Sequence, residues 1–119
     1  MFTINDLRRY CDEKRLNKIE KGFRNEEVYG YTYDDTDYPT ITITGDVYDI
    51  KNEFLAEDIH IVIDYEKGII KKGYCDCRYI RENRRVCDHL LLLVYAFLFD
   101  IENGNIQVGP NNRKTDYVL

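Results

Sequence analysis

The chain has 119 residues, of which 44% are hydrophobic and 33% charged, with only seven glycines and two prolines. This length suits one compact domain, and the composition excludes collagen-like, low-complexity and intrinsically disordered chains. The formal net charge of −5 is unevenly divided: residues 26–66 hold twelve Asp/Glu and one Lys, whereas the segments on either side are each basic by three charges. The net negative charge of the chain argues against a dedicated nucleic-acid-binding protein, although a local basic patch could still bind phosphates.

The sequence predicts neither a membrane span nor a signal peptide. Its longest apolar run, 90–99, is too short to cross a bilayer as a helix, which takes about 20 residues. The first residues mix acidic and basic side chains where a signal peptide needs an apolar stretch. We therefore expect a cytoplasmic protein with no membrane contact. Its four cysteines should stay reduced, as metal ligands or core residues.

The N-terminal half predicts helix followed by strands. Thr3 and Asp6 have the spacing of a capping box, and the apolar residues that follow recur at roughly helical intervals. We expect one helix, or a broken pair, up to about residue 22. From Val28 onward aromatic and β-branched residues alternate with polar ones, which predicts two strands, at about 28–33 and 41–47, separated by a turn.

The C-terminal half predicts a hairpin followed by a helix. Apolar residues occupy alternate positions over 59–65, and 66–68 is typical of a tight reversal, so a partner strand should run over 69–75. An apolar helix is expected over 86–101, with the Asn-Gly pair at 103–104 as its C-terminal cap. The fold class is therefore predicted to be α+β: an N-terminal helix, an antiparallel sheet of about four strands and a C-terminal helix.

Four residues with metal-ligand chemistry form two close pairs, Cys75-x-Cys77 and, after nine further residues, Cys87-x-His89. A tetrahedral Zn²⁺ takes four ligands of this kind. Residues i and i+2 of a strand point to the same side, and side chains in the first turn of a helix tilt back toward its N-terminus. The spacing therefore predicts one structural zinc that clips the C-terminal helix to the last hairpin.

Two other interpretations of these residues stay open. Disulfide bonds would suit a secreted protein, and Cys87 with His89 could in principle act as a nucleophile and its base. We favour zinc because no secretion signal is evident, the fourth residue is a His at ligand spacing, and four protein ligands leave the ion no open position for catalysis. The expectation is a protein that is not an enzyme and has no small-molecule substrate.

The remaining candidate residues have mostly structural interpretations. His60 has the opposite parity to the strand isoleucines and should be solvated or paired across strands, and Cys11 should be a small buried hydrophobe. The apolar helix is either a core element or an exposed docking face for a partner. Several tyrosines lie within the acidic segment, where stacking on nucleic acid is disfavoured.

Basic residues gather around the predicted metal loop. They are either a solvated surface or contacts to phosphates or to an acidic partner. The candidate contact residues are Lys71, Lys72, Arg78, Arg81, Arg84 and Arg85.

The pattern Cys75-x-Cys77-x9-Cys87-x-His89, on a hairpin followed by an apolar helix, resembles the SWIM zinc finger. Upstream, residues 15–28 are similar to the helix and glycine-aromatic turn that precede the strands in bacterial members, so the resemblance spans about residues 7–101. It implies a ββα zinc module of the kind found near the N-terminus of bacterial Swi/Snf-type helicase-like ATPases and in plant transposases, with protein or DNA binding proposed. We expect one such domain over 1–104, with its zinc core at about 59–101, and a tail or linker over 105–119.

Two positions depart from the family pattern. Asp88 stands where the family frequently has Lys, and Arg78 replaces a common Pro. Asp88 is a suitable helix N-cap, but it removes a positive charge from the edge of the metal site, which weakens the inference of DNA binding.

The sequence as a whole predicts a non-enzymatic zinc module. It would act as a protein-interaction adaptor or as an accessory domain of a Swi/Snf-type ATPase, since these residues hold no phosphate-binding loop of their own. The alternative is DNA binding through the basic metal loop. The partner, the oligomeric state, the role of the tail and whether the natural chain extends beyond Leu119 stay open.

Overall fold

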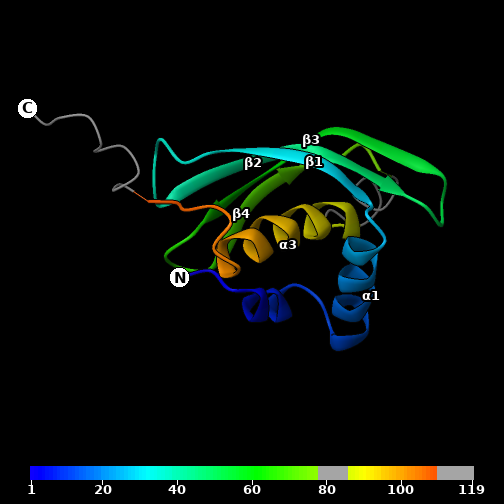
Figure 1. The fold of residues 1–119 in the computed structure, drawn as a ribbon, viewed down its shortest axis with the longest axis horizontal. Helices are drawn as coiled ribbons and strands as arrows, with labels where there is room; N and C mark the ends of the chain where they lie inside the picture. Colours follow the sequence, from blue (N-terminus) through cyan, green and yellow to red (C-terminus); the bar gives the residue numbers. More distant parts are fainter. Residues whose placement is uncertain (78–85, 110–119) are drawn as a thin grey trace, which may run out of the picture.

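The protein is an antiparallel four-stranded sheet with helices on one face (Figure 1). We analysed a computed structural model, which describes residues 1–77 and 86–109. The sheet order is β1-β2-β3-β4, with every neighbouring pair antiparallel. The elements in chain order are a 3-10 helix η1 (Ile4–Arg9), α1 (Glu13–Arg24), β1 (Val28–Asp34), β2 (Thr40–Asp49), β3 (Phe54–Asp64), β4 (Ile69–Tyr74) and α3 (Asp88–Glu102). The predicted α+β class is confirmed.

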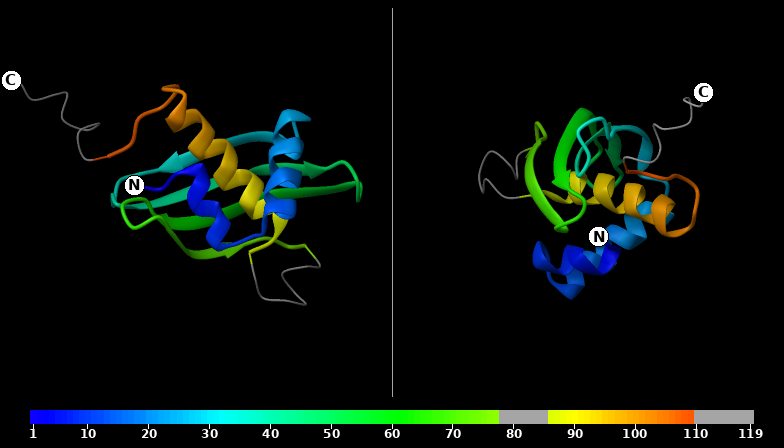
Figure 2. Two further views of the ribbon diagram at one scale, coloured as in Figure 1. Left: turned by 90° about the horizontal axis from the view of Figure 1, so that it is seen from below. Right: turned by 90° about the vertical axis from the view of Figure 1, so that its left-hand side faces the viewer.

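The N-terminal segment is the broken pair of helices rather than one helix. Asp6 accepts a hydrogen bond from the Thr3 backbone N–H at 2.8 Å, as the capping-box spacing predicts. Asp12 then caps α1 by accepting from the Arg15 backbone N–H at 2.8 Å. This second cap fixes where α1 begins, and α1 then runs in a new direction beside the first turns of α3 (Figure 2).

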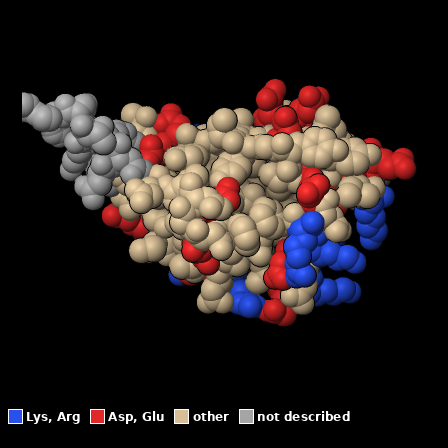
Figure 3. All heavy atoms as spheres, viewed as in Figure 1, with Lys and Arg blue, Asp and Glu red and all other residues tan. Residues whose placement is uncertain are grey.

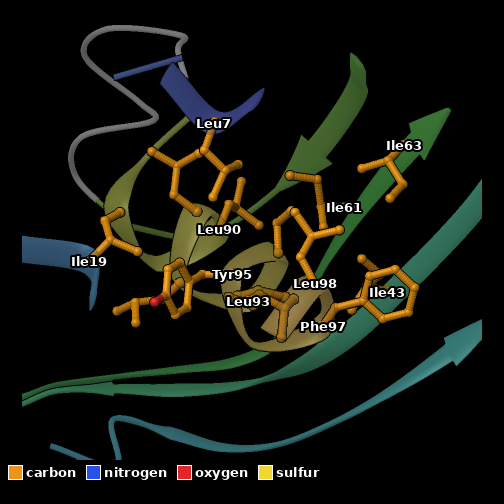
Figure 4. Packing of buried hydrophobic residues seen from close by; sticks show 14 of the residues in the cluster. Leu7, Ile19, Ile43, Ile61, Ile63, Leu90, Leu93, Tyr95, Phe97 and Leu98 are labelled. Atoms are coloured by element: carbon orange, nitrogen blue, oxygen red, sulfur yellow. The ribbon is translucent and has the colours of Figure 1, made fainter. Parts of the chain in front are cut away.

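Helix α3 lies between the sheet on one side and η1 with α1 on the other (Figures 1 and 2). Residues from Leu90 to Leu98 are all buried, so the helix is a core element and the docking-face alternative is wrong. Figure 4 shows Leu90, Leu93 and Phe97 directed from α3 into the core. Isoleucines of β2 and β3 supply the opposite wall: Ile41, Ile43, Ile59, Ile61 and Ile63.

A close approach between layers requires glycine at position 45. A Cβ built there would lie 2.4 Å from the Gly30 carbonyl oxygen and 2.7 Å from a Leu93 methyl group. The ladder between β2 and β3 shifts register just after this residue, between Gly45 and Val47. The strands can therefore bend around α3 without losing the alternation that buries their isoleucines.

Two elements begin at residues that differ from the sequence prediction by two positions or more. Strand β3 begins at Phe54, not near residue 59, and α3 begins at Asp88, not at 86. The N-cap of α3 is Cys87, so the prediction that Asp88 caps the helix is wrong. After the cap at Asn103, residues 105–109 form neither helix nor strand, and residues 110–119 lie outside the described part of the chain.

Candidate metal centre

The four predicted ligands meet where β4 ends and α3 begins. Cys75 directly follows β4, Cys87 is the N-cap of α3, and His89 is the second residue of that helix. One ligand atom from each of Cys75, Cys77, Cys87 and His89 lies within 4.8 Å of every other. Cys11, the fourth cysteine, is outside this group.

Local structure explains why these side chains converge. Cys75 and Cys77 are both buried while Asp76 between them is exposed, which is the alternation of an extended chain. On the helix side, Cys87 and His89 lie at the very start of α3, where side chains tilt back toward the helix N-terminus and the end of β4. The strand pair and the helix pair thus face one another.

The distances fit a single tetrahedral ion. With bonds of about 2.0–2.3 Å, sulfur and nitrogen ligands of one zinc ion lie roughly 3.3–3.8 Å apart. Here the Nδ1 atom of His89 is 3.7 Å from the Sγ atom of Cys75 and 4.0 Å from that of Cys87. These two contacts would have to shorten by a few tenths of an ångström, and a pair at the outer limit of 4.8 Å by about 1 Å, for all four donors to bind one ion. The cluster could therefore hold a metal ion.

His89 is held in place by a carboxylate that the sequence analysis missed. Its Nε2 atom lies 2.9 Å from Oδ2 of Asp49, the last residue of β2. Asn52 in turn fixes Asp49, donating from its backbone N–H at 3.0 Å and from its side-chain amide at 2.7 Å. This partner leaves Nδ1 for the sulfurs and sets the imidazole tautomer, as carboxylates commonly do for metal-bound histidines.

Two of the four candidate ligands, Cys87 and His89, have raised pKa values. A hydrogen bond with Cys75, together with burial, raises the pKa of Cys87 to about 12. Burial opposes a charged imidazole, but hydrogen bonds with Cys87 and Asp49 outweigh it and raise the pKa of His89 to about 10. Burial likewise opposes ionisation of Asp49, yet the bonds from Asn52 and His89 leave its pKa below the usual value. A bound cation would compete with these protons for the same donor atoms.

Helix α1 clamps the start of α3 beside the cluster. The Arg15 guanidinium donates to Oδ1 of Asp88 from Nε at 2.9 Å and from Nη2 at 2.7 Å, and to the Val86 carbonyl at 3.1 Å. Lys18 adds an ion pair to the other Asp88 oxygen at 3.0 Å. Burial opposes ionisation of the Asp88 carboxyl group, but the nearby Lys18 and Arg15 cations hold its pKa below the ordinary range. Two positive charges from α1 thus reach the edge of the cluster where Asp88 lies.

The other predicted residues that the structure describes lie outside the cluster. Lys71 and Lys72 are exposed on β4, and Arg78, Arg81, Arg84 and Arg85 lie outside the described residues. His60 is exposed and stacks on Tyr74, its cross-strand partner, with ring centroids 5.4 Å apart, so the cross-strand prediction is confirmed. Cys11 is only half-buried, with its Sγ atom 3.5 Å from the Leu7 carbonyl oxygen.

Comparison with protein family models, with curated proteins and with solved structures returned no match. No helix within residues 1–77 and 86–109 is long and apolar enough to span a membrane.

Proposed function

We propose that the cluster binds one structural zinc ion and that the protein is a non-enzymatic module of the SWIM type. The observation that carries this proposal is the convergence of three buried sulfurs and one imidazole nitrogen within 4.8 Å of one another. Cys75, Cys77, Cys87 and His89 would be the ligands. Zinc is the metal of choice because three thiolates and one imidazole match its preferred donors in closed tetrahedral sites.

A structural role follows from the completeness of the donor set. Catalytic zinc keeps a coordination position for water or substrate, whereas four protein ligands fill a tetrahedral ion. The ion would supply a cross-link between β4 and α3, and the chain's own residues would orient it: Asp49 through His89, and Arg15 through Asp88. The finished module would present a surface to a protein partner, alone or as an accessory domain of a Swi/Snf-type ATPase.

Metal analysis of purified protein tests the site. Native mass spectrometry should find one zinc ion per chain, and cobalt substitution should give the absorption of a tetrahedral site with sulfur ligands. Cys77→Ser should lose the ion, whereas Cys11→Ser, a matched change outside the cluster, should keep it. Fully folded protein that carries no metal ion, or a Cys77→Ser variant that binds as well as the wild type, would overturn the proposal.

DNA binding is the second candidate function. It is favoured by the exposure of Lys71 and Lys72 on the strand that leads into Cys75. If this surface binds phosphates, replacing Lys71, Lys72, Arg81, Arg84 and Arg85 with Gln should weaken binding and lower the salt slope by roughly one per lost phosphate contact. The measurement is a salt titration of fluorescence anisotropy with a labelled duplex. Binding that does not respond to salt, or no binding, removes this candidate.

A further inference from the structure

A hollow of about 370 Å³ adjoins the metal centre. It lies between α1, the end of β2 and the first turns of α3. Apolar residues contribute to its lining, among them Ile19 and Leu92, which are buried in the core. Ile50, which is 51% exposed, lies at its edge. The hollow therefore offers an apolar floor that an incoming side chain could cover.

Glycine at position 22 leaves space in the hollow, because it has no side chain to fill it. A Cβ there would lie 2.7 Å from Oε1 of Glu27 and 3.3 Å from both Leu92 methyl groups. Glycine inside a helix costs about 1 kcal/mol relative to alanine, and α1 accepts that cost at a buried position. A larger residue would push into the side chains that line the hollow.

The carboxylates of the hollow are already engaged, but two of its ammonium groups are not. The Asp49 carboxylate accepts a hydrogen bond from Asn52 and pairs with His89. The Asp88 carboxylate pairs with Arg15 and Lys18. The Glu27 carboxylate lies 3.4 Å from the Ile50 backbone N–H. Within residues 1–77 and 86–109, the ammonium groups of Lys21 and Lys51 form no ion pair or hydrogen bond. Three lysines and three carboxylates line the hollow, and among the lysines Lys21 and Lys51 are available to pair with an incoming carboxylate.

The positive charge continues along α1 beyond the hollow. Lys14, Lys18 and Lys21 are spaced i, i+4 and i+7, so they share one face of the helix, and they line a neighbouring shallow groove. Figure 3 shows Lys and Arg gathered at the end of the molecule where α1 lies, with Asp and Glu over the sheet. We call this surface, made of the hollow and these lysines with Lys51, the α1 surface.

We propose that the α1 surface binds an acidic segment of a protein partner. One apolar side chain of that segment would enter the hollow against Ile19 and Leu92, while carboxylates beside it pair with Lys21 and Lys51. This inference rests on the proposed function, because it names the kind of partner that the zinc module would bind. Charge complementarity selects the partner, and the apolar floor adds specificity.

The same features argue against nucleic acid on this surface. A phosphate backbone carries charge without an apolar side chain, so it would leave the floor of the hollow uncovered. Acidic residues also interrupt the lysines on and around α1, including Glu13, Glu20 and Glu27. A peptide can place its few carboxylates between these acids, whereas a regular array of phosphates cannot.

A labelled synthetic peptide that alternates Glu and Leu tests this inference. Wild-type protein should bind it, with an affinity that falls as salt is added, and Lys21→Glu with Lys51→Glu should weaken binding at least tenfold. Lys71→Glu with Lys72→Glu makes the same charge change on β4 and should leave binding within about twofold, since Debye screening confines surface charge effects to roughly 8 Å at physiological salt. A peptide with Ser in place of Leu should bind more weakly than the Leu peptide.

The outcomes separate this inference from the zinc proposal. Metal content is measured in every sample, and circular dichroism checks folding, with the milder Lys21→Gln and Lys51→Gln pair as a second variant. Full metal loading without peptide binding overturns the peptide inference alone, as does equal weakening by the two charge-reversal pairs. Tighter binding of a labelled oligonucleotide through Lys21 and Lys51 would overturn it in favour of nucleic acid. Metal-free protein in which β4 and the first turn of α3 are as well protected as β2 and β3 instead overturns the zinc proposal.

Discussion

Helix α3 is attached to the rest of the protein in two different ways along its length. Its middle is held by apolar packing: Leu93 and Phe97 are fully buried against β1, β2 and β3. Its first turn is held by directional groups, with Cys87 and His89 facing the sulfurs of the segment that follows β4 and Asp88 paired to α1. The stability of the middle of α3 should therefore depend on the volume of the buried side chains. That of its first turn should depend on charge, protonation and bound metal.

Strand β4 shows what this difference means for stability. None of its six residues is fully buried: Ile69 and Ile70 are half-buried and the other four are exposed. By contrast, five isoleucines of β2 and β3 are at most 1% exposed. Hydrophobic burial alone thus holds β2 and β3 in place, whereas the end of β4 depends on the cluster that follows it. The predictions below act on one region or the other.

Removing the metal should have the largest effect, and it should be local. Zinc binding contributes about 10–16 kcal/mol in small finger peptides that lack another core. In this protein, a chelator should abolish amide-exchange protection in β4 and in the first turn of α3, while β2 and β3 keep theirs. Hydrogen exchange followed by mass spectrometry measures this. Equal loss of protection throughout the sheet would show that the two regions are not separable.

Phe97→Ala tests the apolar region. Its ring is buried and packs against Tyr31 and Tyr33, with centroids 6.1 and 5.4 Å away. Truncation should lower the free energy of unfolding by about 3–5 kcal/mol because a cavity is left behind. Zinc affinity of the folded protein should stay unchanged. Urea unfolding and metal competition on the same variant check the two statements, and a parallel fall in zinc affinity would contradict the division into regions.

Asp49→Ala tests the metal region without removing a ligand. Loss of the carboxylate leaves Nε2 of His89 without its partner at 2.9 Å. Comparable changes beside other metal sites lower metal affinity about 10- to 100-fold. Competition with a chromophoric chelator measures the change, and Glu57→Gln, which removes an exposed negative charge from β3, serves as the control. Equal affinities for wild type and Asp49→Ala would mean that the carboxylate does not position the ligand.

The sequence could predict the cluster because its geometry is local. Alternation over two residues brings Cys75 and Cys77 together, and a helix start does the same for Cys87 and His89. The contact between Asp49 and His89 joins residues 40 positions apart and depends on how far β2 extends, which no short pattern encodes. The start of β3 was missed for a physical reason too: Asp58 has a φ of 50° where the ladder shifts register, so apolar alternation fails there.

The partners of Asp88 show a further limit of sequence reasoning. An Asp directly before an apolar helix is expected to be the N-cap residue, but Cys87 occupies that position. Its carboxylate instead pairs with Arg15, which is 73 positions away in the chain. The N-cap preference correctly predicted that Asp88 lies at the start of the helix, but it assigned the carboxylate to the wrong partner. A short stretch of sequence does not show ion pairs between residues that are distant in the chain.

Tyr31→Phe should have the smallest effect of the four changes, and it acts at the opposite end of α3. The Tyr31 hydroxyl donates to Oδ2 of Asp100, so its removal should cost about 1.5 kcal/mol near neutral pH. Tyr33→Phe is the matched control, because its hydroxyl makes only an exposed contact of 3.3 Å to the Gln107 carbonyl.

The pH dependence of this pair gives the sharpest test. Burial, and then the hydrogen bond to Asp100, raise the pKa of Tyr31 above its ordinary value of about 10. The unfolded chain releases this proton first, so the stability that the neutral hydroxyl contributes is complete below about pH 10 and falls as pH rises further. The stability difference between wild type and Tyr31→Phe should therefore shrink above about pH 10, while that for Tyr33→Phe stays near zero. A difference for Tyr31→Phe that is constant between about pH 7 and pH 11 would show that the hydroxyl is not held by the Asp100 carboxylate.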